Sequence, residues 1–131
     1  MNYHDEHEML ELALEAGGMA WWRMELPTGT VFFSENKTRM LGRSKQDFYH
    51  YTDFTKLVHP DDYEPMMQAM QNHLDGKTTT YETTYRIRHA DGTYLTFFDK
   101  GRVVSRKDGE IVIAGIVMSI DAHGQQAIAR A

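Results

Sequence analysis

The sequence predicts an α+β domain in which helices flank an antiparallel sheet. Three runs rich in β-forming residues occupy the second half, and they are separated by Asp91-Gly92 and Asp108-Gly109. Asp-Gly between alternating runs is the strongest short-range signal for a β-hairpin, so these runs predict a three-stranded antiparallel meander. Apolar residues at helical spacing near the N-terminus and before Gly76 predict helices. The expected strands of the meander are 79–89, 93–105 and 110–120.

The N-terminal elements follow from the spacing of apolar residues and glycines. A helix over residues 5–16 carries an apolar stripe and ends at Gly17-Gly18, since glycine readily adopts the conformation that closes a helix. A strand over 20–26, a turn and a short second strand come next. Trp21 and Trp22 are consecutive on the first strand, so they point to opposite faces. We expect one in the core and the other beneath the N-terminal helix.

The middle of the chain predicts short helices. Ser34 is a suitable N-cap for a helix that runs to Leu41 and stops at Gly42, with Lys37 where a capping box would have glutamate. Residues 44–58 predict short helical turns. The inward-facing side chains of these turns are expected to be Phe48, Phe54 and Leu57.

The stretch "VHPDDYEP" places a histidine beside two adjacent carboxylates. A metal or hydrolytic site would need further converging ligands, or a nucleophile with an oriented base, and the nearby sequence supplies neither. The start of a helix explains it better, since prolines and carboxylates suit a first helical turn. A helix that began at Pro60 would place Pro65 at its sixth position and lose an interior hydrogen bond, at about 3 kcal/mol. We therefore predict a separate turn over 60–62, with Asp62 as the N-cap of the main helix.

The two hairpins predict which side chains share a face of the sheet. A first loop of two or four residues places Tyr85 and Ile87 on the same face as Thr96 and Phe98. A two-residue second loop extends this face into the last strand. The meander is apolar on both faces, so the middle helices must cover one face, and the N-terminal helix or a second copy of the chain the other. The opposite face would carry Leu95, Phe97, Val103, Val112, Ala114, Ile116, Met118 and Ile120.

Six short motifs occur in a fixed order along the chain. They are WWRMELPTG (21–29), MLG (40–42), VHPDD (58–62), YRIRHADGTY (85–94), KDGEI (107–111) and GIVMSID (115–121). In this order and spacing the chain resembles a PAS domain of the PAS/PAC sensor type over nearly its whole length. The resemblance implies the PAS fold, a five-stranded antiparallel sheet flanked by short helices, with an N-terminal helix. It divides the chain into an amphipathic helix (1–17), the PAS/PAC domain (18–121) and the start of a linker or tail (122–131).

The resemblance implies a sensory or regulatory module of a bacterial or archaeal signalling protein. Such a module binds a small ligand, mediates dimerisation, or does both, and it relays a signal to a covalently linked output domain. A sensor histidine kinase is the favoured parent, and a diguanylate cyclase, another regulator or a haem- or flavin-holding redox sensor are the alternatives. The chain has Ser119-Ile120-Asp121 where the family usually has Asp-Ile-Thr, which leaves open whether Asp121 replaces the missing carboxylate. It also has Thr96 where the family often has tryptophan.

The candidate site residues come from the predicted faces and from the methionines. Methionines of the helix before Gly76 could be ordinary core or the wall of an adaptable pocket. Hydroxyls on the sheet suit a partly polar ligand, and they could equally bond one another or a buried water. The ligand-pocket candidates are Met40, Leu57, Met67, Met70, Tyr85, Thr96, Phe98, Val117 and Ser119. The face for the N-terminal helix or a homodimer partner is expected to carry Leu10, Leu14, Phe97, Ile116 and Met118.

His73 is the candidate haem ligand, because some PAS relatives hold haem through a helix histidine in this region. A histidine in the last turn of a helix also suits the helix dipole without any ligand. We expect no resident cofactor and no metal, with haem or non-covalent flavin as the alternatives. The absence of cysteine excludes cysteine-based flavin photochemistry, disulfides and thiolate nucleophiles.

Composition narrows the function classes further. The net charge of −5, with acids and bases interspersed, argues against a nucleic-acid or anionic-membrane partner. No apolar run approaches the roughly 20 residues that span a bilayer, so we expect a cytoplasmic domain without direct membrane contact, in a parent protein that could be membrane-associated. No nucleophile, base or phosphate loop is assembled, which predicts a non-catalytic domain. Arg86 and Arg88 are expected to pair across strands near Glu82.

Overall fold

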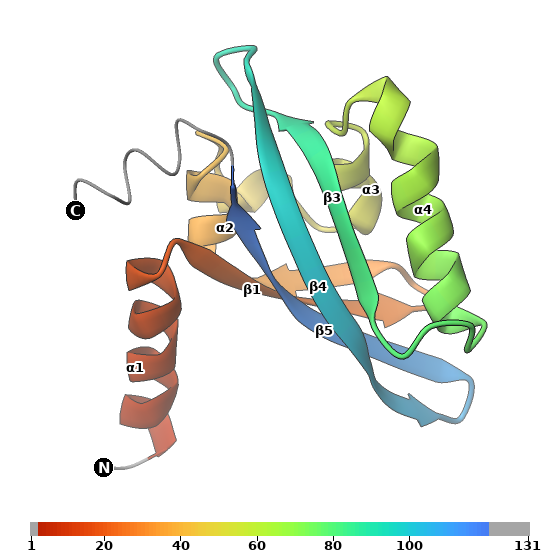
Figure 1. Cartoon of the computed structure of the whole chain (residues 1–131). Helices are drawn as coiled ribbons and strands as arrows, with labels where there is room; N and C mark the ends of the chain where they lie inside the picture. The colour runs from red at the N-terminus through yellow and green to blue at the C-terminus, as the bar shows by residue number, and fades with distance from the viewer. Residues whose placement is uncertain (1–2, 121–131) are drawn as a thin grey trace.

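The computed structural model describes residues 3–120, which form a five-stranded antiparallel sheet with helices on both of its faces (Figure 1). The strands lie in the order β2-β1-β5-β4-β3, so the first and last strands of the chain pair at the centre. This confirms the predicted sheet; Asp121 and the tail expected over 122–131 lie outside the described residues. The elements are α1 (Tyr3–Ala16), β1 (Met19–Leu26), β2 (Thr30–Phe33), α2 (Glu35–Arg39), the 3-10 helix η1 (Lys45–Asp47), α3 (Tyr51–Thr55), α4 (Pro60–Leu74), β3 (Tyr81–Arg88), β4 (Tyr94–Lys107) and β5 (Glu110–Ser119).

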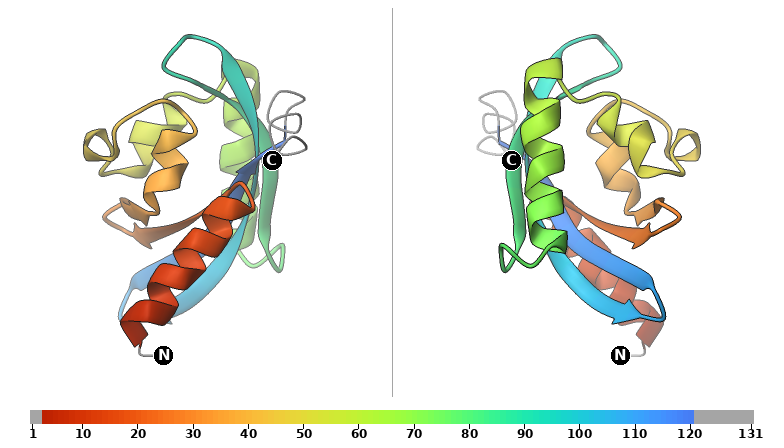
Figure 2. Two further views of the ribbon diagram at one scale, coloured as in Figure 1. Left: turned by 90° about the vertical axis from the view of Figure 1, so that its left-hand side faces the viewer. Right: turned by 90° about the vertical axis from the view of Figure 1, so that its right-hand side faces the viewer.

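Helices lie on both sides of the sheet (Figure 2). Helices α2, α3 and α4 cover the face that we call the inner face, and α1 packs on the opposite, outer face against β1. The consecutive tryptophans divide between them, as predicted. Trp22 is buried on the inner face, and the Trp21 indole on the outer face donates a hydrogen bond to Glu11 of α1 at 2.9 Å. No helix within residues 3–120 has the length and apolar character needed to cross a membrane.

The core lies between the inner face and the three helices that cover it. Phe33, Phe48 and Phe54 pack edge to face or tilted, with ring centroids 4.3–6.3 Å apart, and they fix the short helices onto β2. The inward positions predicted for Phe48, Phe54 and Leu57 are confirmed. The hydroxyl of Ser34 does not cap α2, because it accepts the backbone N–H of Trp21 at 3.1 Å instead.

Helix α4 is unbroken, so the separate turn predicted at its start is wrong. The N-cap is His59 and not Asp62: the Nδ1 of His59 accepts the backbone N–H of Asp61 at 3.1 Å, and Pro60 occupies the first helical position. Pro65 lies inside the helix, where it removes the hydrogen bond to the carbonyl of Asp61. Both of those residues are exposed, so water can solvate that carbonyl and reduce the cost.

The carboxylate of Asp62 binds the edge strand β3 instead of capping α4. It accepts the backbone N–H of Arg86 at 2.8 Å, and the guanidinium nitrogens Nε and Nη2 of the same residue at 2.8 and 2.9 Å. Arg86 therefore pairs with Asp62 of α4, and the predicted cross-strand pairing of Arg86 near Glu82 is wrong. The hydrogen-bonded guanidinium lowers the pKa of Asp62 to about 2. The contact also covers part of an edge strand that would otherwise offer free N–H groups to another sheet.

The first hairpin loop of the meander is longer than predicted. Arg88 pairs with Tyr94, so the loop comprises residues 89–93. A loop with an odd number of residues shifts the register by one relative to a loop of two or four, and a one-residue shift moves every side chain to the other face. Tyr85 therefore shares the inner face with Phe97, and the predicted positions of Thr96 and Phe98 on that face are wrong.

A β-bulge at Val104 keeps the second hairpin consistent with this register. Val103 pairs with Ile113 and Ser105 with Val112, which leaves Val104 unpaired between them. The two-residue loop at Asp108-Gly109 is confirmed by the pairing of Lys107 with Glu110. The bulge offsets the shift of the first loop, so the β5 residues lie on the face predicted for them, together with Tyr85. The β4 residues before the bulge lie on the face opposite to the predicted one. The inner face carries Leu95, Phe97, Asp99, Val103, Ile113, Gly115, Val117 and Ser119.

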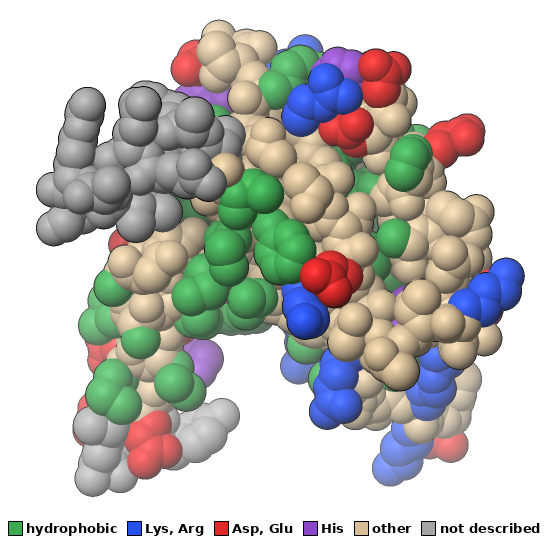
Figure 3. Space-filling model, viewed as in Figure 1, with side chains coloured by type: hydrophobic (Ala, Val, Ile, Leu, Met, Phe, Trp, Pro, Cys, Tyr) green, Lys and Arg blue, Asp and Glu red, His purple; other side chains and the backbone are tan. Residues whose placement is uncertain are grey.

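The outer face keeps an apolar surface beside α1. Phe98 pairs with Met118 there, Ile116 pairs with Trp21, and all four side chains are partly exposed. Figure 3 shows hydrophobic side chains gathered on this side of the molecule, between α1 and the middle of the sheet. The outer positions predicted for Ile116 and Met118 are therefore right.

Candidate ligand cavity

A cavity of about 260 Å³ lies between the inner face of the sheet and helices α2, α3 and α4. Its walls are mostly apolar, with four methionines among them, and a few polar side chains converge on it. This composition is typical of small-molecule sites. The lining residues are Trp22, Met24, Leu26, Val31, Lys37, Tyr51, Phe54, Thr55, Val58, Met66, Met67, Met70, Gln71, Leu74, Tyr81, Tyr85, Ile87 and Asp99.

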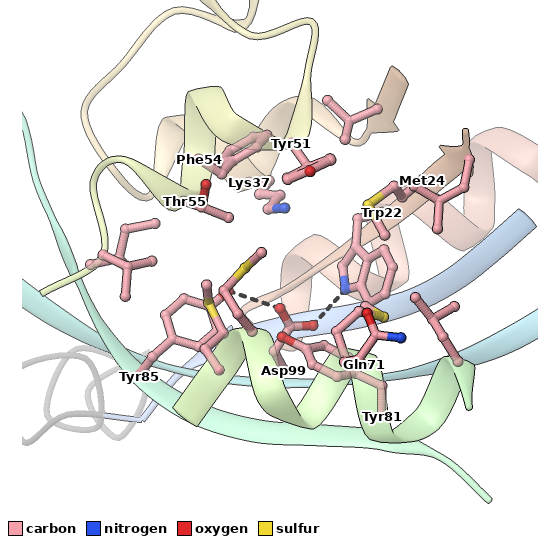
Figure 4. A pocket seen from close by; sticks show the side chains of 18 residues that line it. Trp22, Met24, Lys37, Tyr51, Phe54, Thr55, Gln71, Tyr81, Tyr85 and Asp99 are labelled. Atoms are coloured by element: carbon pink, nitrogen blue, oxygen red, sulfur yellow. Dashed lines mark hydrogen bonds between the residues drawn. The ribbon is translucent and has the colours of Figure 1, made fainter. Parts of the chain in front are cut away.

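Asp99 of β4 is a carboxylate at the sheet side of the cavity, and only 6% of it is exposed. Its two oxygens accept separate hydrogen bonds, one from the Trp22 indole Nε1 at 2.7 Å and one from the Tyr85 hydroxyl at 2.8 Å (Figure 4). Burial raises the pKa of Asp99, while the charge of Lys37 and the two hydrogen bonds act in the opposite direction.

Two glycines allow Trp22 to reach Asp99. Gly101 and Gly115 pair across β4 and β5 on the inner face, directly under the Trp22 ring. A Cβ atom at either position would lie 2.7–2.8 Å from the ring carbon Cζ2, well inside van der Waals contact. The absence of side chains at this pair lets the indole lie close to the sheet, with its N–H directed at the carboxylate.

Lys37 of α2 faces Asp99 from the helical side of the cavity (Figure 4). Only 8% of the residue is exposed, and its ammonium nitrogen lies 3.8 Å from the centroid of the Phe54 ring, a cation–π contact. Burial lowers the pKa of Lys37 from its usual 10.5 to about 8, and the charge of Asp99 partly offsets this. The cavity therefore holds two buried ionisable groups of opposite sign, Lys37 and Asp99. They form no ion pair with each other.

Tyr81 and Tyr85 complete the wall on β3. Burial, reinforced by the charge of Asp99, raises both tyrosine pKa values well above their usual range, so both hydroxyls stay neutral at physiological pH. The Tyr81 ring meets Trp22 edge to face, with the centroids 6.1 Å apart. Three aromatic rings thus surround the carboxylate of Asp99.

A family model described as the PAS fold matches residues 30–117, well over half of the chain. The chain belongs to the PAS family. PAS domains are non-catalytic sensor modules, which agrees with the prediction that this domain is not an enzyme. No curated protein matches the sequence significantly.

Solved structures share this PAS fold at low sequence identity. A sensory box histidine kinase/response regulator from Burkholderia thailandensis is 21% identical, with 92% of this chain and 91% of that chain covered and a TM-score of 0.72. The N-terminal domain of a diguanylate cyclase with a PAS/PAC sensor from Marinobacter aquaeolei is 20% identical over 83% and 98% of the chains, with a TM-score of 0.70. The PAS-B domain of Drosophila melanogaster Cycle with bound ethylene glycol is 20% identical over 77% and 99%, with a TM-score of 0.63.

The PAS cavity brings together some of the predicted pocket residues and not others. Met67, Met70 and Tyr85 line it. Four other candidates lie outside its wall: Met40, Leu57 and Val117 belong to the core around it, and Ser119 lies on the inner face of the sheet. Thr96 and Phe98 point to the outer face because of the shifted register.

Sequence reasoning missed the charged residues of the cavity, Lys37 and Asp99, and its aromatic residues other than Tyr85. One signal was present at Lys37, since a lysine stands where a capping box would have glutamate. At Asp99, a carboxylate directly follows two phenylalanines of β4. Its direction depends on the register, so the incorrect register hid it.

Phe97 is fully buried in the core and therefore cannot belong to the predicted dimer face. The same register shift explains this error, because Phe97 points inward with Asp99 and not outward with Met118. Leu10 of α1 is 61% exposed and Leu14 is partly exposed, so both remain available on the helix.

His73 is buried outside the cavity wall, with both ring nitrogens bonded to the backbone. Its Nδ1 lies 2.9 Å from the carbonyl of Thr78, and its Nε2 accepts the N–H of Val103 at 2.9 Å. These partners assign the proton to Nδ1. The N–H of Val103 lies beyond the end of β3, so His73 supplies the acceptor that a neighbouring strand would otherwise give. A haem iron could bind Nε2 only after displacing that N–H. Residues 3–120 contain no cluster of three or more His, Asp or Glu side chains placed to hold a metal ion.

Proposed function

We propose that this PAS domain senses a small molecule held in the cavity and relays its presence to a covalently attached output domain. The observation that carries the proposal is the pair of buried ionisable side chains, Lys37 and Asp99, on a mostly apolar cavity wall. Burial of a charge is costly unless the charge is paired and hydrogen-bonded. A cavity that served only packing would be filled more favourably by apolar side chains, so these groups favour a ligand.

The output domain in this proposal is a sensor histidine kinase, with a diguanylate cyclase as the alternative. Two of the similar structures support this choice, since one is described as a histidine kinase/response regulator and the other as a diguanylate cyclase with a PAS/PAC sensor. A bound ethylene glycol in a third PAS domain of the same fold supports small-molecule binding by such a domain.

Native mass spectrometry of the purified domain tests ligand binding directly. We expect either a co-purified small molecule or a species that takes up ligand from a fragment mixture and melts at a higher temperature. Saturation at about 100 times the Kd stabilises a domain by about 2.7 kcal/mol. An absorbance spectrum of the same sample distinguishes the haem and flavin alternatives.

A matched pair of variants on α4 locates the binding site. Met67→Trp fills the cavity and should abolish both the bound mass and the thermal shift, whereas Tyr63→Trp adds the same ring on the exposed side of the helix and should preserve them. Binding that survives in Met67→Trp as well as in Tyr63→Trp would contradict the cavity as the site.

We also propose that the outer face and α1 mediate a homodimer. The support is the apolar surface that Ile116 and Met118 form beside α1, together with three exposed apolar side chains on α1, Met9, Leu10 and Leu12. Light scattering at high protein concentration should give the mass of a dimer, and Leu10→Glu should lower it toward that of a monomer. Tyr49→Glu, at an exposed residue remote from this face, is the control. A wild-type protein that stays monomeric at high concentration would rule the dimer out.

A further inference from the structure

The ammonium group of Lys37 faces the cavity without a hydrogen-bond acceptor. Its contact with the Phe54 ring provides π-electron density but no lone pair. Across residues 3–120 the Lys37 side chain makes neither a hydrogen bond nor an ion pair. An ammonium carries three donors, and the nitrogen of Lys37 is accessible from the cavity. The cavity wall therefore presents a cationic donor for which this part of the chain supplies no acceptor.

Both oxygens of the carboxylate across the cavity already have a donor from the protein. Each oxygen of Asp99 accepts a short hydrogen bond, from Trp22 at 2.7 Å and from Tyr85 at 2.8 Å. A cationic ligand would have to share Asp99 with these two donors, and it would be repelled by Lys37. A ligand that brings an acceptor completes the coordination of Lys37 and leaves the Asp99 hydrogen bonds intact. The group that the cavity lacks is thus an anion.

The rest of the wall restricts what the anion can be attached to. Met66, Met67 and Met70 of α4, together with Leu26 and Leu74, offer flexible apolar surface. A second negative charge on the ligand would approach Asp99, which disfavours dianions. The volume of about 260 Å³ lies just below the range of pockets for drug-sized ligands, which starts at about 300 Å³.

We propose that the cavity takes a small monocarboxylate with an apolar body, and that the carboxylate of the ligand pairs with Lys37. The inference rests on the proposed function, because it names the class of ligand for the same cavity. A hydrogen bond between an ammonium and a carboxylate is roughly twice as strong as one between neutral groups. The primary amide of the same acid has nearly the same shape with a neutral acceptor, so acid and amide together isolate the contribution of charge.

The test is a calorimetric titration with matched acids and amides at pH 7. The probes are hexanoate and hexanamide, octanoate and octanamide, and phenylacetate and phenylacetamide. The proteins are the wild type, Lys37→Met and Lys45→Met. Lys45 is the control, because it also lies over a phenylalanine ring, with its nitrogen 5.4 Å from the Phe33 centroid, but it is exposed and does not line the cavity.

We expect at least one acid to bind the wild type and Lys45→Met at least tenfold more tightly than its amide. In Lys37→Met the acid and its amide should bind equally within about threefold. Amides that bind the wild type as tightly as the acids, or a preference for acids that persists in Lys37→Met, would overturn the monocarboxylate class.

Failure of this class and failure of the sensor cavity give different results. If neutral fragments bind while no acid does, and Met67→Trp abolishes that binding, the ligand class is wrong and the cavity remains the site. If neither acids nor neutral fragments bind, and no co-purified molecule is found, both proposals fail.

Discussion

Replacement of Lys37 by methionine should stabilise the PAS domain at pH 7. Methionine has a similar length and flexibility without the charge, so it can keep the contact with Phe54 while the buried ammonium is removed. Burial lowers the pKa of Lys37 from 10.5 to about 8. At about 1.4 kcal/mol for each pKa unit, the charged form costs about 3 kcal/mol more in the folded protein than in the unfolded chain.

Two losses reduce the gain from this replacement. A desolvated cation–π contact such as that with Phe54 contributes about 1–2 kcal/mol. Asp99 also loses the neighbouring positive charge that lowers its pKa. The net gain in the free energy of unfolding should therefore be about 1–2 kcal/mol. For a domain of this size, that corresponds to a rise in melting temperature of about 4–8 °C.

The pH dependence of this gain has a definite sign. Because the pKa of Lys37 is lower in the folded protein, the unfolded chain binds more protons between pH 8 and 10.5. The stability of the wild type should therefore rise with pH across that window relative to a protein without this lysine. The advantage of Lys37→Met should be full at pH 7 and should narrow toward pH 10.

Urea denaturation at pH 7 and pH 10 measures both effects. The samples should first be unfolded and refolded, since a co-purified acid would stabilise the wild type selectively. Lys45→Met should change the unfolding free energy little at either pH, because that lysine is exposed. A Lys37→Met variant less stable than the wild type at pH 7, or a gap that stays constant to pH 10, would refute the reasoning.

Two further predictions concern the edge strand and the floor of the cavity. Asp62→Asn should lower the melting temperature at pH 7, because the carboxylate accepts three hydrogen bonds from Arg86. The wild type should lose the same stability as pH falls from about 4 to 2, since the pKa of Asp62 is lowered to about 2. Melting temperatures of the wild type and the variant that stay apart at pH 2 would contradict this. Gly115→Ala should cost about 3 kcal/mol in urea denaturation, because its Cβ would lie 2.2 Å from a backbone carbonyl oxygen of β4. Gly76→Ala, which meets nothing within 4 Å but has a φ of +80°, should cost only about 1 kcal/mol, and an equal cost at the two sites would argue against the steric explanation.

Local sequence signals were sufficient for the identity and order of most elements. The Asp-Gly dipeptides marked both hairpins, and the glycines after α1 and α4 marked the helix ends. The predicted start of α4 was wrong because Pro65 was assigned the full cost of a lost interior hydrogen bond, about 3 kcal/mol. The exposed carbonyl of Asp61 makes that proline tolerable, and burial of a single backbone group depends on tertiary packing.

The faces of β4 could not be predicted in the same way. The faces depend on the five-residue loop and on the one-residue bulge at Val104. Neither feature can be recognised from the order of apolar and polar residues along the strand. Each alone reverses a face, so the composition of the strand is compatible with either outcome. This is why Asp99 and its contact with Trp22 emerged only from the structure, while Met67 and Met70, whose helix has its own period, were found.

The adjacent tryptophans of β1 have a practical consequence for spectroscopy of this protein. The chain contains two tryptophans, and they are neighbours. One indole is hydrogen-bonded to the carboxylate in the cavity and the other to α1 on the opposite side of the sheet. The entire tryptophan emission of the domain therefore originates from two consecutive residues, whose indoles lie on opposite faces of the sheet. A Trp21→Phe variant would leave one fluorophore in contact with the cavity, and a Trp22→Phe variant one in contact with the N-terminal helix, so the two environments can be followed separately without an added label.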